Sequence, residues 1–243
     1  MDGAPLTSLW PRLRSYASNR NLCPQSPSPL PHGVPPLQHE KASPVMTSPA
    51  TPSSSESFTV CVFCGSSLGN DPQFGREARE LGQRIARAGW SLVFGGGDVG
   101  LMGETARAVR ALGQPVHGVL PEFLQQQEHP MSHGESLELT ADLQSRKRRL
   151  LAAANAFVLL PGGFGTLDEF FEVLTEAQLG VHHKPIILVD VAGYYTPLLA
   201  LLEHAVRHGF ARPESLGFVS RVPDAATAIE SLLQGAGDVP VRP

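Results

Sequence analysis

From residue 58 onward, short apolar runs alternate with segments of helical spacing, and this alternation constrains the fold more than any other feature. The apolar runs are rich in β-branched and aromatic residues, which suits strands buried on both faces of a parallel sheet. Between them, apolar residues recur at helical intervals, as at Leu81, Ile85 and Ala88. The order of the segments predicts an α/β fold built on a doubly wound parallel sheet, with ligands at the carboxyl ends of the strands.

The expected strands and helices account for most of one domain. The strands are expected at 58–64, 90–94, 116–120, 156–160, 185–189 and 218–221. The helices are expected at 78–88, 101–112, 142–154, 166–179, 197–208 and 224–233. A chain of 243 residues can bury a sizeable core in one domain of this kind but is short for two. We therefore expect a single domain over 57–235 and a flexible C-terminus at 236–243.

Residues 1–56 differ in composition from the rest of the chain. They hold 11 of the 22 prolines, many serines and little hydrophobic periodicity, so they offer too little apolar surface to offset the entropy of ordering. We expect a disordered N-terminal tail. Its arginines, Arg12, Arg14 and Arg20, weakly resemble those of a transit peptide. The alternatives are a dispensable tail or a start site placed too early, with Met46 as the true start.

Charge and composition argue against several classes of partner. The formal net charge of −4 and a pI near 6.1 disfavour general binding of nucleic acid, which requires basic surface. The longest apolar run, 150–160, is about half of the ~20 residues that a membrane span needs and contains Asn155. Three cysteines cannot form a disulfide framework in a chain of this length, which favours a reducing compartment. We expect a cytoplasmic protein that binds neither nucleic acid nor membranes.

The segment PGGFGTLDE at 161–169 directly follows an expected strand and opens an expected helix. Its glycines allow close backbone approach to a ligand, and the free N–H groups of a helix N-terminus favour a phosphate. Thr166 can add a hydroxyl donor, and Glu169 lies about one turn into the helix, within reach of a sugar beyond the phosphate. The alternative is a tight strand-to-helix turn with Asp168 and Glu169 as N-terminal helix charges. That alternative does not explain three glycines with a threonine.

A second glycine cluster, GGGDVGLMG at 95–103, contains G-x-G-x-x-G at Gly95, Gly97 and Gly100. Alone, this spacing suggests a dinucleotide-binding fold. The cluster follows the second expected strand rather than the first, however, and Glu122, the acid nearest the place where a ribose ligand should stand, lies in an expected loop. We interpret the cluster as a second backbone wall of a mononucleotide pocket.

Two further patterns are interpreted as structural. Cys61 and Cys64 have C-x-x-C spacing, but positions i and i+3 of a strand face opposite sides, so we expect two core cysteines rather than a redox pair. The adjacent His182 and His183 have no nearby carboxylate and are expected in a solvated loop. We expect no metal site, and the chain has no G-x-S-x-G segment that would indicate a hydrolase serine.

Four motifs in order resemble those of the LOG (Lonely Guy) family of cytokinin riboside 5'-monophosphate phosphoribohydrolases, often labelled lysine decarboxylases. They are GSS at 65–67, the 95–103 cluster, Arg146-Lys147 and the 161–169 segment, accompanied by AQLG at 177–180 and GYY at 193–195. The resemblance covers residues 58–233. It implies a modified Rossmann fold, no cofactor, a homodimer or higher homo-oligomer, and hydrolysis of (N6-substituted) adenosine 5'-monophosphate to the free base and ribose 5-phosphate.

The resemblance also implies roles for individual residues. Arg146 and Glu169 fall at the family's catalytic positions. The implied substrate contacts are Ser67, Gly96, Gly97, Glu128, Lys147, Gly162, Gly163, Phe164, Gly165, Thr166, Leu167, Asp168 and Thr175. The chain departs from the family pattern at Leu143-Gln144, where Met-His is common, and at Glu176, where Trp is common. These departures leave open whether the base is adenine or a prenylated adenine.

The chemistry of the reaction suits two of these residues. Cleavage of an N-glycosidic bond builds positive charge on the ribose, and a carboxylate at Glu169 can stabilise it and orient or deprotonate water. Arg146 cannot readily lose a proton, so we assign it to orienting Glu169 and holding substrate oxygens. The rival hypotheses are a non-catalytic nucleotide or molybdenum-cofactor carrier of the same fold, which would not need both residues, and a dinucleotide-dependent oxidoreductase.

Overall fold

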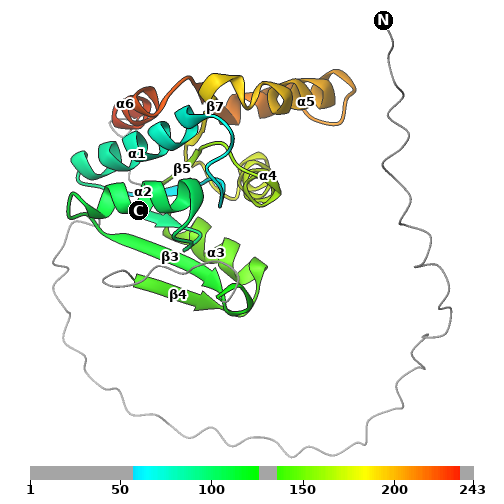
Figure 1. Cartoon of the computed structure of the whole chain (residues 1–243). Coiled ribbons are helices and arrows are strands. Elements are labelled where there is room, and N and C mark those ends of the chain that lie inside the picture. Colours follow the sequence, from blue (N-terminus) through cyan, green and yellow to red (C-terminus); the bar gives the residue numbers. More distant parts are fainter. Residues whose placement is uncertain (1–56, 126–135, 236–243) are drawn as a thin grey trace, which may run out of the picture. The chain divides into compact units, whose positions relative to one another are not determined.

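A sheet of seven parallel strands, in the order β4-β3-β2-β1-β5-β6-β7, forms the centre of the molecule (Figure 1). The structure is a computed structural model that describes residues 57–125 and 136–235. The strands are β1 (Thr59–Phe63), β2 (Ser91–Phe94), β3 (Val116–Pro121), β4 (Ser136–Thr140), β5 (Ala156–Leu159), β6 (Ile186–Val189) and β7 (Val219–Val222). The expected α/β fold with a doubly wound parallel sheet is confirmed.

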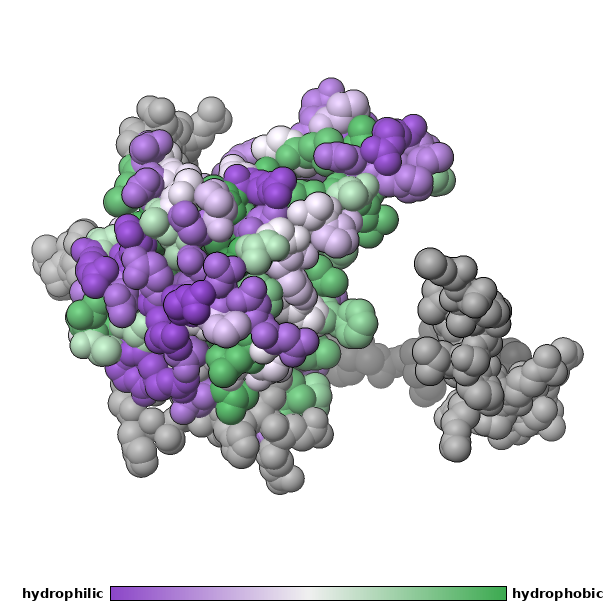
Figure 2. Space-filling view, turned by 45° about the horizontal axis from the view of Figure 1, so that its top comes forward, coloured by the Kyte–Doolittle hydropathy of each residue, from purple (hydrophilic) through white to green (hydrophobic). Residues whose placement is uncertain are grey.

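Helices cover both faces of the sheet. They are α1 (Pro72–Arg87), α2 (Gly100–Arg110), α3 (Leu143–Ala153), α4 (Phe164–Gln178), α5 (Thr196–Arg207) and α6 (Ala225–Gly235), with short 3-10 turns η1 (Glu122–Leu124), η2 (Val191–Gly193) and η3 (Pro213–Phe218). Helices α1, α2 and α6 pack their apolar residues on one face, and α3 and α4 pack theirs on the other. Helix α5 buries none of its residues and projects beyond the sheet (Figure 1), and hydrophobic residues lie exposed among hydrophilic ones along it (Figure 2).

The structure differs from the sequence-based expectation in one strand and in several helix ends. Strand β4 was not predicted, because it lies at the sheet edge and only Thr140 in it is buried. Helix α1 begins six residues earlier than expected, at Pro72, because Asp71 accepts a hydrogen bond from the Gln73 N–H at 2.8 Å. Helix α4 begins two residues earlier than expected, at Phe164, so its N-terminus lies within the glycine segment.

The two cysteines of β1 and the loop after it lie on opposite faces of the sheet, and one of the two adjacent histidines is partly buried. Cys61 belongs to the core under α3 and α4, and Cys64 to the core under α1 and α2, so the prediction of diverging core cysteines is confirmed. Burial, with a smaller effect of nearby Glu169, raises the pKa of both thiols. The expectation of a solvated loop is wrong for His182: its Nε2 lies 3.0 Å from the Val173 carbonyl oxygen, and burial lowers its pKa.

Several expectations concern residues outside the described ranges. The N-terminal tail at 1–56, the C-terminus at 236–243 and Glu128 all fall there. Within the described ranges, every helix is too short or too polar to cross a membrane.

The strand order places a crevice between β1 and β5, where the chain turns to helices on opposite faces of the sheet. The loops after these two strands touch there. The Gly65 N–H donates to the Pro161 carbonyl at 3.0 Å, and a Cβ on Gly162 would lie 2.9 Å from the Gly65 nitrogen and 2.1 Å from Thr166 Oγ1. Glycine is therefore required at 162 for the two loops and the start of α4 to pack together.

The close packing of α1 on α2 gives a test of the fold. A Cβ on Gly82 would lie 2.4 Å from the Thr105 carbonyl oxygen and 2.8 Å from Ala108 Cβ. We expect Gly82→Ala to lower the free energy of unfolding by about 1–3 kcal/mol, because the two helices must separate. Gly217→Ala is the control, since nothing lies within 4 Å of its Cβ. Urea unfolding curves measure both, and equal stability of the two variants would contradict this packing.

Candidate active site

The N-terminus of α4 has no side chain to satisfy its first N–H groups. Its N-cap is Gly163, whereas α1 and α3 begin with Asp71 and Asp142, whose carboxylates accept hydrogen bonds from the first turn. The first N–H groups of an α-helix have no partner within the helix, and the helix dipole adds positive potential there. The start of α4 is therefore open to an anion such as a phosphate.

The N-terminus of α2 is closed by the protein itself. The Gly65 carbonyl accepts hydrogen bonds from the N–H groups of Leu101, at 3.0 Å, and Met102, at 3.3 Å. Gly100 has a φ of +61°, and a Cβ on it would lie 2.3 Å from the carbonyl carbon of Ser66. The second glycine cluster thus packs α2 against the loop after β1. A pyrophosphate would need the N–H groups that Gly65 already occupies, which argues against a dinucleotide site here.

Arg146 on α3 and Glu169 on α4 form an ion pair in which Nη1 lies 3.0 Å from Oε1. Their side chains are only 14% and 7% exposed. The guanidinium is fixed from a second side, since its Nε donates to the Val119 carbonyl at 3.1 Å. A Cβ on Gly95 would lie 2.2 Å from Nη2, so the residue after β2 must be glycine to admit the arginine.

The ion pair and the start of α4 face one pocket of about 350 Å³. Its lining residues are Val62, Cys64, Gly65, Ser66, Gly95, Met102, Arg146, Gly163, Phe164, Gly165, Thr166 and Glu169. An adjoining pocket of about 260 Å³ shares Gly65, Ser66 and Gly163 with it and extends toward Phe74 and Tyr194. A carboxylate, a guanidinium and an open helix N-terminus therefore converge at the carboxyl ends of β1, β2 and β5.

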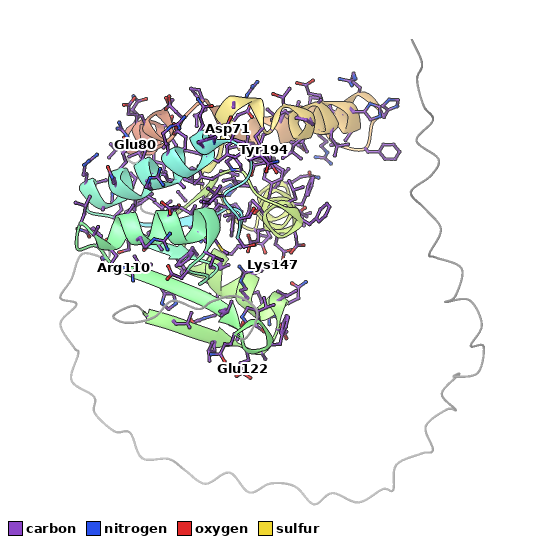
Figure 3. The ribbon with its side chains drawn as sticks, viewed as in Figure 1. Asp71, Glu80, Arg110, Glu122, Lys147 and Tyr194 are labelled. Atoms are coloured by element: carbon purple, nitrogen blue, oxygen red, sulfur yellow. The ribbon has the colours of Figure 1, made fainter. Side chains whose placement is uncertain are left out.

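A second ion cluster connects α3 and α4 outside this pocket. Lys147 Nζ lies 3.2 Å from Asp168 Oδ2 and 3.0 Å from Glu172 Oε2, and its side chain is 6% exposed. Burial opposes the charge of Lys147, but the hydrogen bonds that its ammonium donates to Glu172 and Asp168 prevail and raise its pKa. Figure 3 shows Lys147 on the side of α4 that faces α3, and Tyr194 on the side that faces α1.

The structure brings together some of the residues predicted for the site and separates others. Arg146, Gly163, Phe164, Gly165, Thr166 and Glu169 line the larger pocket, and Ser67 and Gly162 line the adjoining one. The remaining predicted contacts in the described ranges line neither pocket. Gly96 and Gly97 are buried, Lys147 and Asp168 pair with each other, Leu167 packs against the core, and Thr175 is exposed further along α4.

Sequence reasoning placed the second glycine cluster at the pocket but did not name Gly95 or Met102 among the substrate contacts, and it missed Phe74 and Tyr194. Gly95 and Met102 stand within the second glycine cluster, and Tyr194 stands within the GYY segment, so motifs marked the segments but not these residues.

Among the residues that the structure describes, no group of three or more His, Cys, Asp or Glu side chains is placed to hold a metal ion.

Comparison with known proteins places the chain in a family. Residues 102–232 match a family described as "possible lysine decarboxylase". The cytokinin riboside 5'-monophosphate phosphoribohydrolase LOG7 of Arabidopsis thaliana is 41% identical over 173 residues, which are 71% of this chain and 80% of that protein. The chain belongs to the LOG family. A further relative, "Probable cytokinin riboside 5'-monophosphate phosphoribohydrolase LOGL2" of Oryza sativa subsp. japonica, is 42% identical over 71% of each chain.

Solved structures show the same LOG fold at lower identity. The molybdenum cofactor binding protein of Rippkaea orientalis has a TM-score of 0.58 at 23% identity and covers 75% of this chain and 99% of its own. The molybdenum cofactor carrier protein of Chlamydomonas reinhardtii has a TM-score of 0.58 at 22% identity over 75% and 100%. At these identities the likeness shows the fold alone.

The lysines of this LOG-family chain give no support to a decarboxylase that holds pyridoxal phosphate on a lysine. In the described ranges the lysines are Lys147 and Lys184, and neither lines the pockets. Lys147 is ion-paired between helices. Lys184 precedes β6, at the amino-terminal ends of the strands, whereas the site lies at their carboxyl ends, and its Nζ donates to the Leu151 carbonyl at 2.7 Å.

The Lys147 cluster can be tested through stability. Lys147→Met keeps the aliphatic stem but leaves Asp168 and Glu172 facing each other without a cation. We expect a loss of about 1–2 kcal/mol in the free energy of unfolding, less than for a fully buried pair because both carboxylates are partly exposed and can rehydrate. Arg148→Met, at an exposed position on the same helix, should change stability little. Urea unfolding compares them, and a neutral Lys147→Met would contradict a stabilising cluster.

Proposed function

We propose that this chain hydrolyses the N-glycosidic bond of adenosine 5'-monophosphate or an N6-substituted derivative, releasing the free base and ribose 5-phosphate. With a prenylated adenine, the released base is a cytokinin. The observation that carries the proposal is the Arg146–Glu169 ion pair, which faces the same pocket as the open N-terminus of α4. Relatives about 40% identical over most of their length carry the name of this activity.

The pocket supplies separate groups for the two ends of the substrate. The N–H groups at Gly163–Thr166 and the hydroxyl of Thr166 bind the 5'-phosphate. Glu169 lies one turn further along α4, where a ribose attached to that phosphate places its anomeric carbon. Because the phosphate takes no part in bond cleavage, its binding energy positions the sugar for reaction.

Glu169 acts on the charge that develops during cleavage. As the bond to the base breaks, positive charge grows on the ribose, and the Glu169 carboxylate stabilises it and orients or deprotonates the attacking water. Arg146 pairs with one oxygen of Glu169. The Val119 carbonyl and the backbone at Gly95 in turn limit the movement of the Arg146 guanidinium. The carboxylate therefore meets the substrate with its orientation already fixed, which lowers the cost of reorganisation in the transition state.

A non-catalytic carrier of the same fold needs the phosphate-binding loop but not a fixed carboxylate beside it. The likeness to molybdenum cofactor carriers rests on the shared fold and on identities of 22–23%. The Arg146–Glu169 pair therefore favours a hydrolase over a carrier for this chain.

We further propose a homodimer that assembles through the exposed face of α4 and remains in the cytosol. Phe164, 93% exposed, and Phe171, 39% exposed, lie two turns apart on this helix, and Leu179 at its end is 72% exposed. An apolar face of this kind is typical of an interface. The free, buried Cys61 and Cys64 suit a reducing compartment, and the net charge of −4 gives no support to nucleic-acid binding. Sedimentation equilibrium of the full chain tests the dimer.

The test of the proposed function compares phosphorylated and unphosphorylated substrates. We expect release of free base from AMP or from isopentenyladenosine monophosphate, and almost none from adenosine or isopentenyladenosine, because a nucleoside leaves the start of α4 empty. Chromatography of the released base gives all four rates. Equal rates with and without the phosphate would contradict phosphate anchoring, and no base release from either nucleotide would contradict the hydrolase.

A further inference from the structure

Two adjacent tyrosines after β6 donate hydrogen bonds to the segment that leads into α4. The Tyr194 hydroxyl donates to the Gly162 carbonyl at 2.5 Å, and the Tyr195 hydroxyl donates to the Leu160 carbonyl at 2.6 Å. These hydroxyls come from a different part of the chain, more than 30 residues further on. The end of β5 is therefore held in place from the side of β6.

A buried carboxylate holds this pair of tyrosines. Asp190 at the end of β6 has a side chain that is 1% exposed, and its Oδ1 accepts a hydrogen bond from the Tyr195 N–H at 2.6 Å. Its Oδ2 lies 2.5 Å from Nη2 of Arg221 on β7. Between Asp190 and the tyrosines the chain makes a strained turn, since Ala192 has a φ of +52°. Such a backbone conformation persists where surrounding contacts fix it.

The two tyrosines differ in exposure. Tyr195 is fully buried, and burial raises the pKa of its hydroxyl, which therefore remains protonated and able to donate. Tyr194 is 41% exposed, lines the smaller pocket and contacts Phe74 edge to face with ring centroids 5.6 Å apart. Tyr194 (Figure 3) thus lies at the site, whereas Tyr195 belongs to the core.

The geometry of the peptide bond gives the Tyr194 hydrogen bond a consequence at the pocket. In a trans peptide the C=O and the following N–H point in opposite directions within one plane. When the Gly162 carbonyl points to Tyr194, the Gly163 N–H points away from it, and this N–H makes no hydrogen bond with another described residue. Gly163 is the N-cap of α4 and lines both pockets.

We propose that Tyr194 is a positioning residue for the phosphate site, which orients the Gly162–Gly163 peptide so that the Gly163 N–H donates to the 5'-phosphate. This inference rests on the proposed function. Without the hydroxyl, the peptide between two glycines can rotate, and the phosphate must fix it on binding. The free energy of fixing this peptide weakens binding of the substrate and of the transition state equally, so loss of the hydroxyl raises KM without lowering kcat.

Tyr195 supplies a matched control within the same turn. Its hydroxyl fixes the peptide between Leu160 and Pro161, and a peptide that ends in proline has no N–H. Loss of that hydrogen bond leaves a buried carbonyl without its donor and lowers stability, but it frees no donor that faces the phosphate. Tyr195→Phe should therefore lower Tm and leave KM for AMP near the wild-type value.

The test measures base release from AMP and calorimetric binding of ribose 5-phosphate for the wild type, Tyr194→Phe and Tyr195→Phe. For Tyr194→Phe we expect KM and the Kd of ribose 5-phosphate to rise about 3- to 10-fold, the range for one neutral hydrogen bond, with kcat and Tm nearly unchanged. The phenylalanine keeps the ring contact with Phe74, so the change isolates the hydroxyl.

Each outcome separates this inference from the proposed function. Wild-type affinity in Tyr194→Phe overturns the inference, and so does an equal rise in KM for both variants, which would indicate general support of the loop. A wild-type chain that binds ribose 5-phosphate but releases no base overturns the hydrolase and leaves the binding comparison intact. A wild type that does not bind ribose 5-phosphate overturns this inference, whereas base release from AMP alone decides the hydrolase.

Discussion

The ion pair between Arg146 and Glu169 is the interaction on which the rest of the site depends. Removing two charges from water is costly, and their attraction offsets that cost only when the geometry is good and further hydrogen bonds are made. Here the Val119 carbonyl in β3 accepts a hydrogen bond from the guanidinium, and Gly95 after β2 leaves space for it. Two strands and two helices thus converge on one carboxylate, and the position of that carboxylate decides what the pocket can do.

The anion-binding half of the site is built from backbone rather than from charged side chains. Helix α4 begins at an uncapped glycine, and the loops after β1 and β5 pack so closely that Gly162 has no room for a side chain. Glycines permit this close approach because they have no side chain, but the same lack of a side chain lets the peptide between Gly162 and Gly163 rotate. The Tyr194 hydroxyl removes that freedom at the Gly162–Gly163 peptide. A phosphate site made of N–H groups therefore depends on a side chain that never touches the phosphate.

The sequence predicted the fold and the main elements of the site because their signals are local. Buried parallel strands are apolar runs, and PGGFGT marks the start of α4. Strand β4 escaped notice because an edge strand is half solvated and its residues, SLELT, have no continuous apolar run. Contacts between distant segments were also beyond local patterns. The role of Gly95 follows from its contact with the Arg146 guanidinium, and that of Tyr194 from its hydrogen bond to the Gly162 carbonyl; neither contact is marked in the local sequence. Lys147 was predicted to contact substrate, which stays a prediction, and the structure adds its pairing with Asp168 and Glu172.

The central claim is that Glu169 acts on the transition state while the start of α4 binds the phosphate. The most direct measurement is kcat for base release together with the calorimetric Kd of AMP in Glu169→Gln, with Glu172→Gln as the control one turn further along α4. Glu172 pairs with Lys147 outside the pocket. We predict that Glu169→Gln lowers kcat by ~10²-fold or more, equivalent to about 2.7 kcal/mol, with little change in Kd, and that Glu172→Gln leaves both near wild type. Base release by Glu169→Gln at the wild-type rate would contradict the account.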